Sequence, residues 1–250
     1  MSERIFLAGA AGAIGLSLSR LLVARNFQVT GTTRSRQRAD QLRSIGVEPV
    51  LVDVFDASAL AQSVAAARPE VVMHQLTDLS GGFDEAHRKE TLTRNARIRR
   101  EGTANLMRAA LGAGARRIVT QSIAWMYRPR TPPYRESDPL LCEAEGNAAI
   151  SLVGVKALET QVMNAQGIEG VVLRYGYLYG PGTASDHPHG ASTVHVDAAA
   201  YAAMLAAEKG APGLYNIAEP GGEVDSGKAV RELGWSAEFR LPPDAGKSAA

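Results

Sequence analysis

The feature that most constrains the fold is a glycine-rich stretch near the N-terminus, Gly9-Ala10-Ala11-Gly12-Ala13-Ile14-Gly15. It follows the short apolar run 5–8 and opens a helix-like segment at residues 13–25. A glycine motif between a strand and a helix is typical of dinucleotide binding. The helix would direct its first amides, and the positive end of its dipole, at the phosphates. The alternative is a tight turn without a ligand.

Each glycine of the motif has its own predicted role. Gly9 lets the chain turn sharply off the strand, Gly12 has no side chain to block a pyrophosphate, and Gly15 lets the helix lie close to the sheet. The predicted phosphate-binding residues are Gly9, Ala11, Gly12, Ala13, Ile14 and Gly15.

Composition limits the classes of partner. A length of 250 residues suits one α/β domain with a small appendage, and an apolar share of 45% is ordinary for a soluble protein with a core. A net charge of +1 predicts no strong attraction to nucleic acid or to a membrane. The single cysteine, Cys142, indicates a reducing compartment. Because no signal peptide or long apolar run stands in the sequence, we expect a cytoplasmic protein. We expect no metal site.

Apolar strand-like runs alternate with helix-like segments along the chain. The strand-like runs are 27–33, 48–53, 71–74, 116–122 and 170–175. This alternation predicts an α/β fold, a Rossmann doubly wound parallel sheet with a small C-terminal substrate-binding region. We expect residues 1–175 to form the dinucleotide-binding domain. Residues 176–250 would form the substrate-binding region, interleaved with the last sheet elements.

The end of the second predicted strand bears on the choice of cofactor. A site specific for an unphosphorylated ribose usually has an acid there. This chain has Thr33 and Arg34, followed by Arg36 and Arg38. A guanidinium grips a 2′-phosphate that an acid would repel, so NADP(H) is the preferred cofactor and NAD(H) a possible one. The alternative is a solvated, basic helix start.

Two further strand ends carry predicted cofactor contacts. Asp53, followed by Val54, is placed to accept from the adenine amino group, or else to cap the helix that begins near Ala57. The turn Gln75-Leu76 should border the cofactor, because ligands of such sheets lie across the carboxyl ends of the strands.

Several stretches together resemble the extended short-chain dehydrogenase/reductase family, the NAD-dependent epimerase/dehydratases. They run from residue 4 to about 220 in the family's order: 9–15, Asp53, the turn after Val72, Gly102-Thr103, 119–122, 173–175, 179–182 and 195–197. The resemblance implies a Rossmann fold with a nicotinamide cofactor. It also implies that Ser122 stands at the family's catalytic serine position and that Tyr175 lies beside the nicotinamide.

The sequence departs from the family at its acid/base pair, Tyr-x-x-x-Lys. Counting back from Lys156 gives Leu152, and alignment on Glu159 gives Ser151 and Val155 instead. The family needs the pair because hydride transfer to or from a carbonyl carbon leaves charge on the oxygen, and an ammonium lowers the pKa of the phenol that moves the proton. Lys156 would still bind the nicotinamide ribose, or else be solvated.

Tyr127, five residues after Ser122, is the nearest replacement acid in the sequence, with a hydrophobic wall residue as its alternative. We therefore predict an NAD(P)-binding epimerase/dehydratase-like oxidoreductase with Ser122 and Tyr127 as catalytic residues. Its substrate would be a small carbonyl, alcohol or sugar-like molecule, since little chain stands between Gly182 and Val194. The alternative is a non-catalytic NADP(H)-binding sensor or regulatory protein. The family resemblance also suggests a homodimer through the two long helices.

Overall fold

The computed structural model describes residues 3–78 and 85–242. A sheet of seven parallel strands forms its centre, in the order β3-β2-β1-β4-β5-β6-β9. These strands are β1 (Arg4–Ala8), β2 (Gln28–Thr33), β3 (Glu48–Leu51), β4 (Val71–His74), β5 (Arg117–Ile123), β6 (Glu169–Tyr175) and β9 (Gly213–Ile217). A second, two-stranded parallel sheet pairs β7 (Tyr177–Tyr179) with β8 (Thr193–His195).

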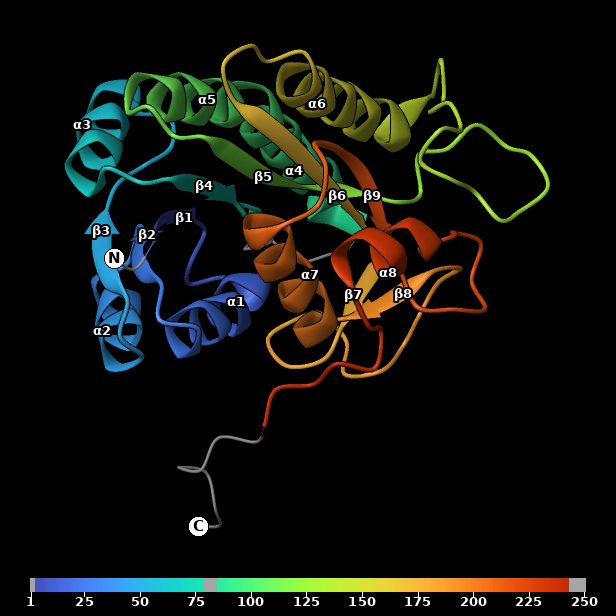
Figure 1. The fold of residues 1–250 in the computed structure, drawn as a ribbon. Coiled ribbons are helices and arrows are strands. Elements are labelled where there is room, and N and C mark those ends of the chain that lie inside the picture. The colour runs from blue at the N-terminus through green and yellow to red at the C-terminus, as the bar shows by residue number, and fades with distance from the viewer. Residues whose placement is uncertain (1–2, 79–84, 243–250) are drawn as a thin grey trace.

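Helices cover both faces of the large sheet (Figure 1). One face carries α1 (Ala13–Ala24), α2 (Arg36–Ser44), α7 (Val196–Glu208) and α8 (Gly227–Leu233). The other carries α3 (Ala57–Ala67), α4 (Glu85–Arg97), α5 (Thr103–Gly112) and α6 (Gly146–Met163). A short π-helical turn, η1 (Ile98–Gly102), joins α4 to α5. The prediction of a doubly wound α/β fold is therefore confirmed.

The strands are apolar on both faces because both faces are buried. Along β1, Ile5 and Leu7 belong to the core beneath α1 and α7, whereas Phe6 and Ala8 belong to the core beneath α3 and α5. Each of these four side chains is at most 1% exposed. The alternation of a strand thus anchors one helical layer on each side.

The strand order reverses between β1 and β4. The chain runs from β1 outward to β2 and β3, and returns to pair β4 with the other edge of β1, with Ala8 opposite His74. This reversal leaves a crevice at the carboxyl ends of the strands, where the helices diverge to opposite faces. The glycine loop after β1 and the turn after β4 therefore lie side by side.

The region after residue 175 contributes to both sheets. Strand β9 extends the large sheet at β6, while β7 and β8 stand apart from it. Helix α7 is rich in alanine and packs against α1 in the same core, which also contains Trp235. The division into two domains at residue 175 stays a prediction, as does the homodimer.

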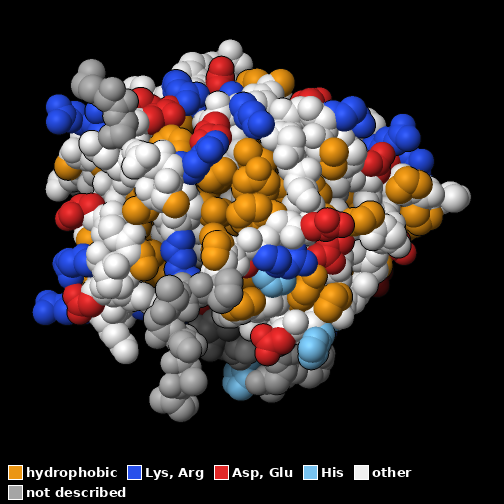
Figure 2. Space-filling view, turned by 60° about the horizontal axis from the view of Figure 1, so that its bottom comes forward, with side chains coloured by type: hydrophobic (Ala, Val, Ile, Leu, Met, Phe, Trp, Pro, Cys, Tyr) orange, Lys and Arg blue, Asp and Glu red, His pale blue; other side chains and the backbone are white. Residues whose placement is uncertain are grey.

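On the face shown in Figure 2, acidic and basic side chains are interspersed around a group of hydrophobic side chains. This mixture agrees with the formal net charge of +1. Among the helices of residues 3–78 and 85–242, none combines the length and the hydropathy that a membrane span requires.

Candidate functional site

The glycine loop has the geometry that each glycine was expected to provide. Gly9 adopts φ +87°, and a Cβ there would lie 2.7 Å from the backbone of Gln75. A Cβ on Gly15 would lie 2.0 Å from the carbonyl oxygen of Gly9, so this residue lets α1 start directly beneath the loop. A Cβ on Gly12 would meet only the Gly9 oxygen, at 3.4 Å. Gly9 and Gly15 are therefore required by close packing, whereas Gly12 keeps open space in front of the loop.

The start of α1 faces this open space. Gly12 is the N-cap residue and has no side chain with which to bind the first amides of the helix. Those amides, which include Ala13, Ile14 and Gly15, have no partner within the helix, since the first turn of any helix leaves its N–H groups unsatisfied. Together with the helix dipole they form a site for an anionic group such as a pyrophosphate.

A cavity of about 360 Å³ opens over the loop. It is lined by Ala8, Gly9, Ala11, Gly12, Thr32, Thr33, Arg34, Arg38, Val52, Asp53, Val54, Phe55, Leu60, Gln75, Leu76, Thr77, Asp78, Arg94, Arg97 and Ile98. Most of the cofactor residues predicted from the sequence are thus brought together here. A glycine cradle, a free helix N-terminus and a flat apolar end fit an adenine dinucleotide.

The far end of the cavity suits a purine ring. Asp53 accepts a hydrogen bond from the backbone N–H of Phe55 at 2.9 Å, and the guanidinium of Arg97 lies 4.0 Å from the centre of the Phe55 ring. Helix α3 is capped by Asp56, which accepts from the Ala59 N–H, and not by Asp53. The capping alternative for Asp53 is therefore wrong, and its carboxylate stays beside the cavity.

Gln75 lines the cavity and contacts Tyr175, which is not among the residues that line it. The backbone N–H of Gln75 donates to the Ala8 oxygen at 2.8 Å, and its side-chain amide lies 3.5 Å from the Tyr175 hydroxyl. The Gln75 Oε1 atom is buried without a hydrogen-bond partner among the described residues. Tyr175 is 2% exposed, and burial raises the pKa of its phenol well above the usual range. Its predicted place beside a nicotinamide stays a prediction.

No phenol–ammonium pair stands on the described part of α6. Leu152 is 4% exposed and packs in an apolar cluster with Ile123, Met126 and Val155. Lys156 donates from Nζ to the Cys142 carbonyl oxygen at 2.9 Å. Its cofactor contact stays a prediction, since Lys156 does not line the cavity over the glycine loop.

The two predicted catalytic hydroxyls lie in one buried network. Ser122 donates from Oγ to Glu159 Oε1 at 2.7 Å, and Arg174 donates from Nε to the same oxygen at 2.9 Å and from Nη2 to Oε2 at 2.6 Å. Arg174 also donates from Nη1 to the Tyr127 hydroxyl at 2.8 Å, and that hydroxyl donates to Asn216 Oδ1 at 2.5 Å. The network therefore joins β5, α6, β6 and β9.

Both predicted catalytic hydroxyls have hydrogen-bond partners inside this network. A catalytic serine needs its hydroxyl in the cleft, but Ser122 is 2% exposed and its hydroxyl points at Glu159, because a buried carboxylate needs donors. Burial raises the pKa of Tyr127, partly offset by Arg174. The catalytic roles of both residues stay predictions. Sequence reasoning gave no role to Arg174, although a charged residue inside an apolar strand is a signal of a buried partner.

A second cavity, of about 100 Å³, lies beyond the ends of β5 and β6. Its walls include two stacked aromatic pairs. The ring centres of Trp125 and Tyr177 are 4.1 Å apart, and those of Tyr127 and Tyr134 are 5.2 Å apart. The aromatic residues that follow both strand ends were a usable sequence signal for this cavity, but only Tyr127 was assigned to a site. Within residues 3–78 and 85–242, no group of three or more His, Cys, Asp or Glu side chains is placed to hold a metal ion.

Comparison with known proteins identifies the family. The model of the NAD dependent epimerase/dehydratase family matches residues 5–238. A 3-diazoavenalumate denitrifying reductase from a Streptomyces species is 37% identical over 236 residues, which cover 86% of this chain and 76% of the relative.

A second curated relative, a 4-hydroxy-2-methyl-3-oxo-4-farnesyl-3,4-dihydroquinoline-1-oxide ketoreductase from Stigmatella aurantiaca, is 26% identical. The match covers 88% of this chain and 66% of that protein. The fold is similar to that of UDP-glucose 4-epimerase from Thermotoga maritima, with a TM-score of 0.76, 17% identity, and coverage of 95% and 94% of the two chains. The relatives' names and the family's description support an oxidoreductase with a nicotinamide cofactor. The chain belongs to the NAD dependent epimerase/dehydratase family.

Proposed function

We propose that the protein is a nicotinamide-dependent reductase that prefers NADP(H) to NAD(H). The observation that carries the proposal is the cavity over the glycine loop, with Gly12 open toward it and the first amides of α1 at its floor. The preference is supported by Thr33, Arg34 and Arg38, which line the cavity at the end of β2, where no acid follows the strand. Guanidinium groups suit a 2′-phosphate through charge-assisted hydrogen bonds.

The surroundings of α6 bear on the substrate. When bound, a reduced nicotinamide supplies a hydride. Reduction of a carbonyl also needs a proton donor at the oxygen. Leu152 has no proton to donate, and Lys156 Nζ donates a hydrogen bond to the backbone oxygen of Cys142. The Tyr127 hydroxyl donates its hydrogen bond to Asn216. These contacts favour a substrate that accepts a hydride without a proton from the protein.

An aryl diazonium ion is such a substrate. It takes up a hydride, with both electrons, and releases N₂, so that an aryl C–H bond replaces the C–N bond. The cation is neutralised and no oxygen acquires charge. The relative that is 37% identical is named as a denitrifying reductase of a diazo compound. The aromatic walls of the smaller cavity support a substrate with a flat ring, since stacked rings are favourable.

Reduction of a small carbonyl compound is the second candidate. It is supported by the ketoreductase among the relatives and by the ring of Tyr127, which lines the smaller cavity. In that case Ser122 and Tyr127 would act as acid–base groups through the network that Arg174 connects.

The experiment compares an aryl diazonium salt with the matched aryl methyl ketone, each mixed with NADPH deuterated at C4. We expect enzyme-dependent oxidation of NADPH and an aryl product that carries the deuterium, with the folded variant Gly12→Val and an enzyme-free mixture as controls. Turnover of the ketone alone would contradict the diazonium proposal in favour of the second candidate. Tight NADPH binding without turnover of either substrate would favour a non-catalytic sensor.

A further inference from the structure

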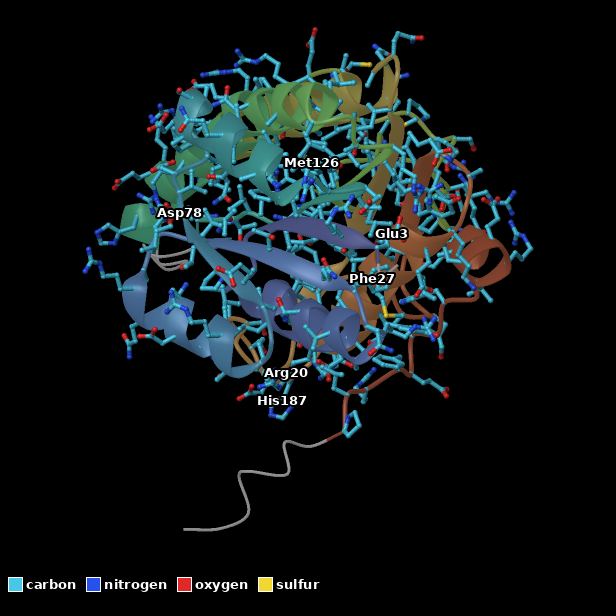
Figure 3. The ribbon with its side chains drawn as sticks, turned by 60° about the vertical axis from the view of Figure 1, so that its left-hand side comes forward. Glu3, Arg20, Phe27, Asp78, Met126 and His187 are labelled. Carbon is cyan, nitrogen blue, oxygen red and sulfur yellow. The ribbon has the colours of Figure 1, made fainter. Side chains whose placement is uncertain are left out.

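A carboxylate stands between two arginines at the edge of the larger cavity. Asp78 Oδ2 lies 3.5 Å from Arg34 Nη2 and 3.6 Å from Arg94 Nε, and all three residues line the cavity. Arg34 follows β2, and Arg94 belongs to α4, which covers the opposite face of the sheet. In Figure 3, Asp78 lies between the helices above the sheet and the blue N-terminal elements below it. The carboxylate thus links the two sides of the cavity.

The hydrogen bonds of Asn95 hold the backbone of Asp78 in place, and its carboxylate moves only by rotation of the side chain. Asn95, which is 6% exposed, accepts from the Asp78 N–H at 3.0 Å and donates to the Asp78 oxygen at 2.7 Å. The Asp78 side chain itself is only 12% exposed. A double hydrogen bond to a buried amide holds Asp78 in place whatever its side chain does, so its charge is a built part of the cavity edge.

Arg34 and Arg94 differ in how much each depends on Asp78 as a hydrogen-bond acceptor. Arg34 is 63% exposed, so water solvates its guanidinium when Asp78 does not. Arg94 is 30% exposed, and its Nε atom is buried without a hydrogen-bond partner in the described part of the chain. A buried N–H without an acceptor is costly. A small movement of Asp78 toward Arg94 would satisfy that N–H and release Arg34.

We propose that Asp78 sets the affinity for 2′-phosphorylated cofactors by competing with the phosphate for Arg34, and that Arg94 receives the carboxylate when the phosphate takes Arg34. This inference rests on the cofactor cavity of the proposed function, and it assigns to Asp78 the role of weakening NADP(H) binding. Asp78 opposes the 2′-phosphate in two ways: it occupies the cation that the phosphate needs, and its own charge repels the phosphate. Arg94 relieves both effects by drawing the carboxylate away.

The test uses 2′,5′-ADP and 5′-AMP as probes, since they differ only in the 2′-phosphate and need no substrate. Dissociation constants are measured by calorimetry for the wild type, Asp78→Asn, Arg94→Gln and the double variant. We expect Asp78→Asn to bind 2′,5′-ADP about three- to tenfold more tightly, with the affinity for 5′-AMP changed less than about twofold, a tenfold change being about 1.4 kcal/mol. The Asn95 clamp, which uses only backbone atoms of Asp78, keeps this variant folded.

The double variant tests the part played by Arg94. Arg94→Gln should weaken 2′,5′-ADP binding about three- to tenfold in the wild type but less than about twofold in the Asp78→Asn background, since Arg94 acts through Asp78. Glu90→Gln is the matched control: Glu90 bonds Arg94 at 2.7 Å but does not line the cavity, and the ratio of the two dissociation constants should not change.

Unchanged or weaker binding of 2′,5′-ADP by Asp78→Asn would overturn the inference. An equal effect of Arg94→Gln in both backgrounds would also overturn it, because Arg94 would then contact the phosphate directly. If the wild type binds neither probe, the cofactor cavity of the proposed function falls as well. Binding of both probes with a ratio that no variant changes contradicts only the role of Asp78.

Discussion

At the scale of single residues, His74 shows how burial sets the state of a side chain. It ends β4, is fully buried, and accepts a hydrogen bond at Nδ1 from the Leu76 N–H at 3.2 Å. Burial, together with the positive charge of Arg99, lowers its pKa from 6.5 to about 3. His74 is therefore neutral in the folded protein, and it holds the turn that borders the cofactor cavity.

This depressed pKa predicts a dependence of stability on pH. The unfolded chain binds a proton at His74 below pH 6.5, whereas the folded chain does so only near pH 3. Above pH 6.5, His74 therefore takes nothing from the free energy of unfolding. Below pH 6.5, protonation of His74 in the unfolded chain lowers that free energy progressively as the pH drops toward 3. Between pH 7 and pH 5 the loss should be about 2 kcal/mol.

Urea unfolding of the wild type and of His74→Asn at pH 7, 6 and 5 measures this loss. Asparagine can still accept from the Leu76 N–H but does not titrate, so the variant should lose about 2 kcal/mol less than the wild type over this range. His187→Asn, which replaces an exposed histidine, should follow the wild type. Parallel curves for the wild type and His74→Asn would contradict the buried, neutral histidine.

At the scale of elements, the network around Arg174 holds three strands and a helix together. Its carboxylate, Glu159, comes from α6, its guanidinium from β6, and its amide, Asn216, from β9. Burial by itself lowers the pKa of Arg174, but the hydrogen bonds and charge of Glu159 outweigh it and hold this pKa above its usual range. A buried ion pair whose members are all hydrogen-bonded fixes how elements meet, and breaking it is costly.

Tyr127→Phe tests how this network uses its phenol. Removal of the hydroxyl leaves Arg174 Nη1 and Asn216 Oδ1 each without a partner, and we expect unfolding to become easier by about 1–3 kcal/mol. Tyr134→Phe is the matched control. Tyr134 also lines the smaller cavity, but its hydroxyl forms hydrogen bonds with the exposed backbone of Arg130. Its free energy of unfolding should stay within about 0.5 kcal/mol of the wild-type value.

Tyr127→Phe also distinguishes diazonium reduction from carbonyl reduction. If Tyr127→Phe kept wild-type stability and lost about 10²–10⁴-fold in kcat, the tyrosine would be an acid–base group and the second candidate would hold. A loss of stability with kcat nearly unchanged assigns its hydroxyl to the network.

At the scale of the whole molecule, the sequence predicted the parts that local patterns encode. The glycine spacing and the apolar strand runs predicted the sheet, its helices and the place of the cavity, because backbone turns and burial leave a direct mark on residue type. Asp53, Gln75 and Arg34 were placed at strand ends, and parallel strands bring those ends together. The seven-stranded parallel sheet confirms the predicted fold, and the family-model match to residues 5–238 confirms the predicted family.

The contacts that depend on distant pairing could not be predicted in this way. Nothing near Ser122 in the chain shows that its hydroxyl meets Glu159, 37 positions later, or that Tyr127 meets Asn216, 89 positions later. Asp78 is 16 residues from Arg94 in sequence, but its relation to Arg34 depends on how β2 and β4 lie across the crevice. Side-chain direction is decided by packing, which residue spacing does not report.

The central claim is that the glycine loop forms the phosphate floor of a nicotinamide dinucleotide site, and Gly12→Val tests it most directly. Gly12 has extended backbone angles, φ −82° and ψ 176°, which valine adopts without strain, and its Cβ would meet only the Gly9 oxygen at 3.4 Å. The variant should therefore fold while its side chain fills the space above the loop. Gly112→Val, where a Cβ would meet nothing within 4 Å, is the control.

The measurement is a titration of both variants and the wild type with NADPH, followed by cofactor fluorescence, with folding checked by circular dichroism. We expect the wild type and Gly112→Val to bind alike, and folded Gly12→Val to bind at least about a hundredfold more weakly, since it loses charge-assisted contacts worth roughly 1.5–3 kcal/mol each. Wild-type affinity in folded Gly12→Val would contradict the account, because the phosphates would then lie elsewhere.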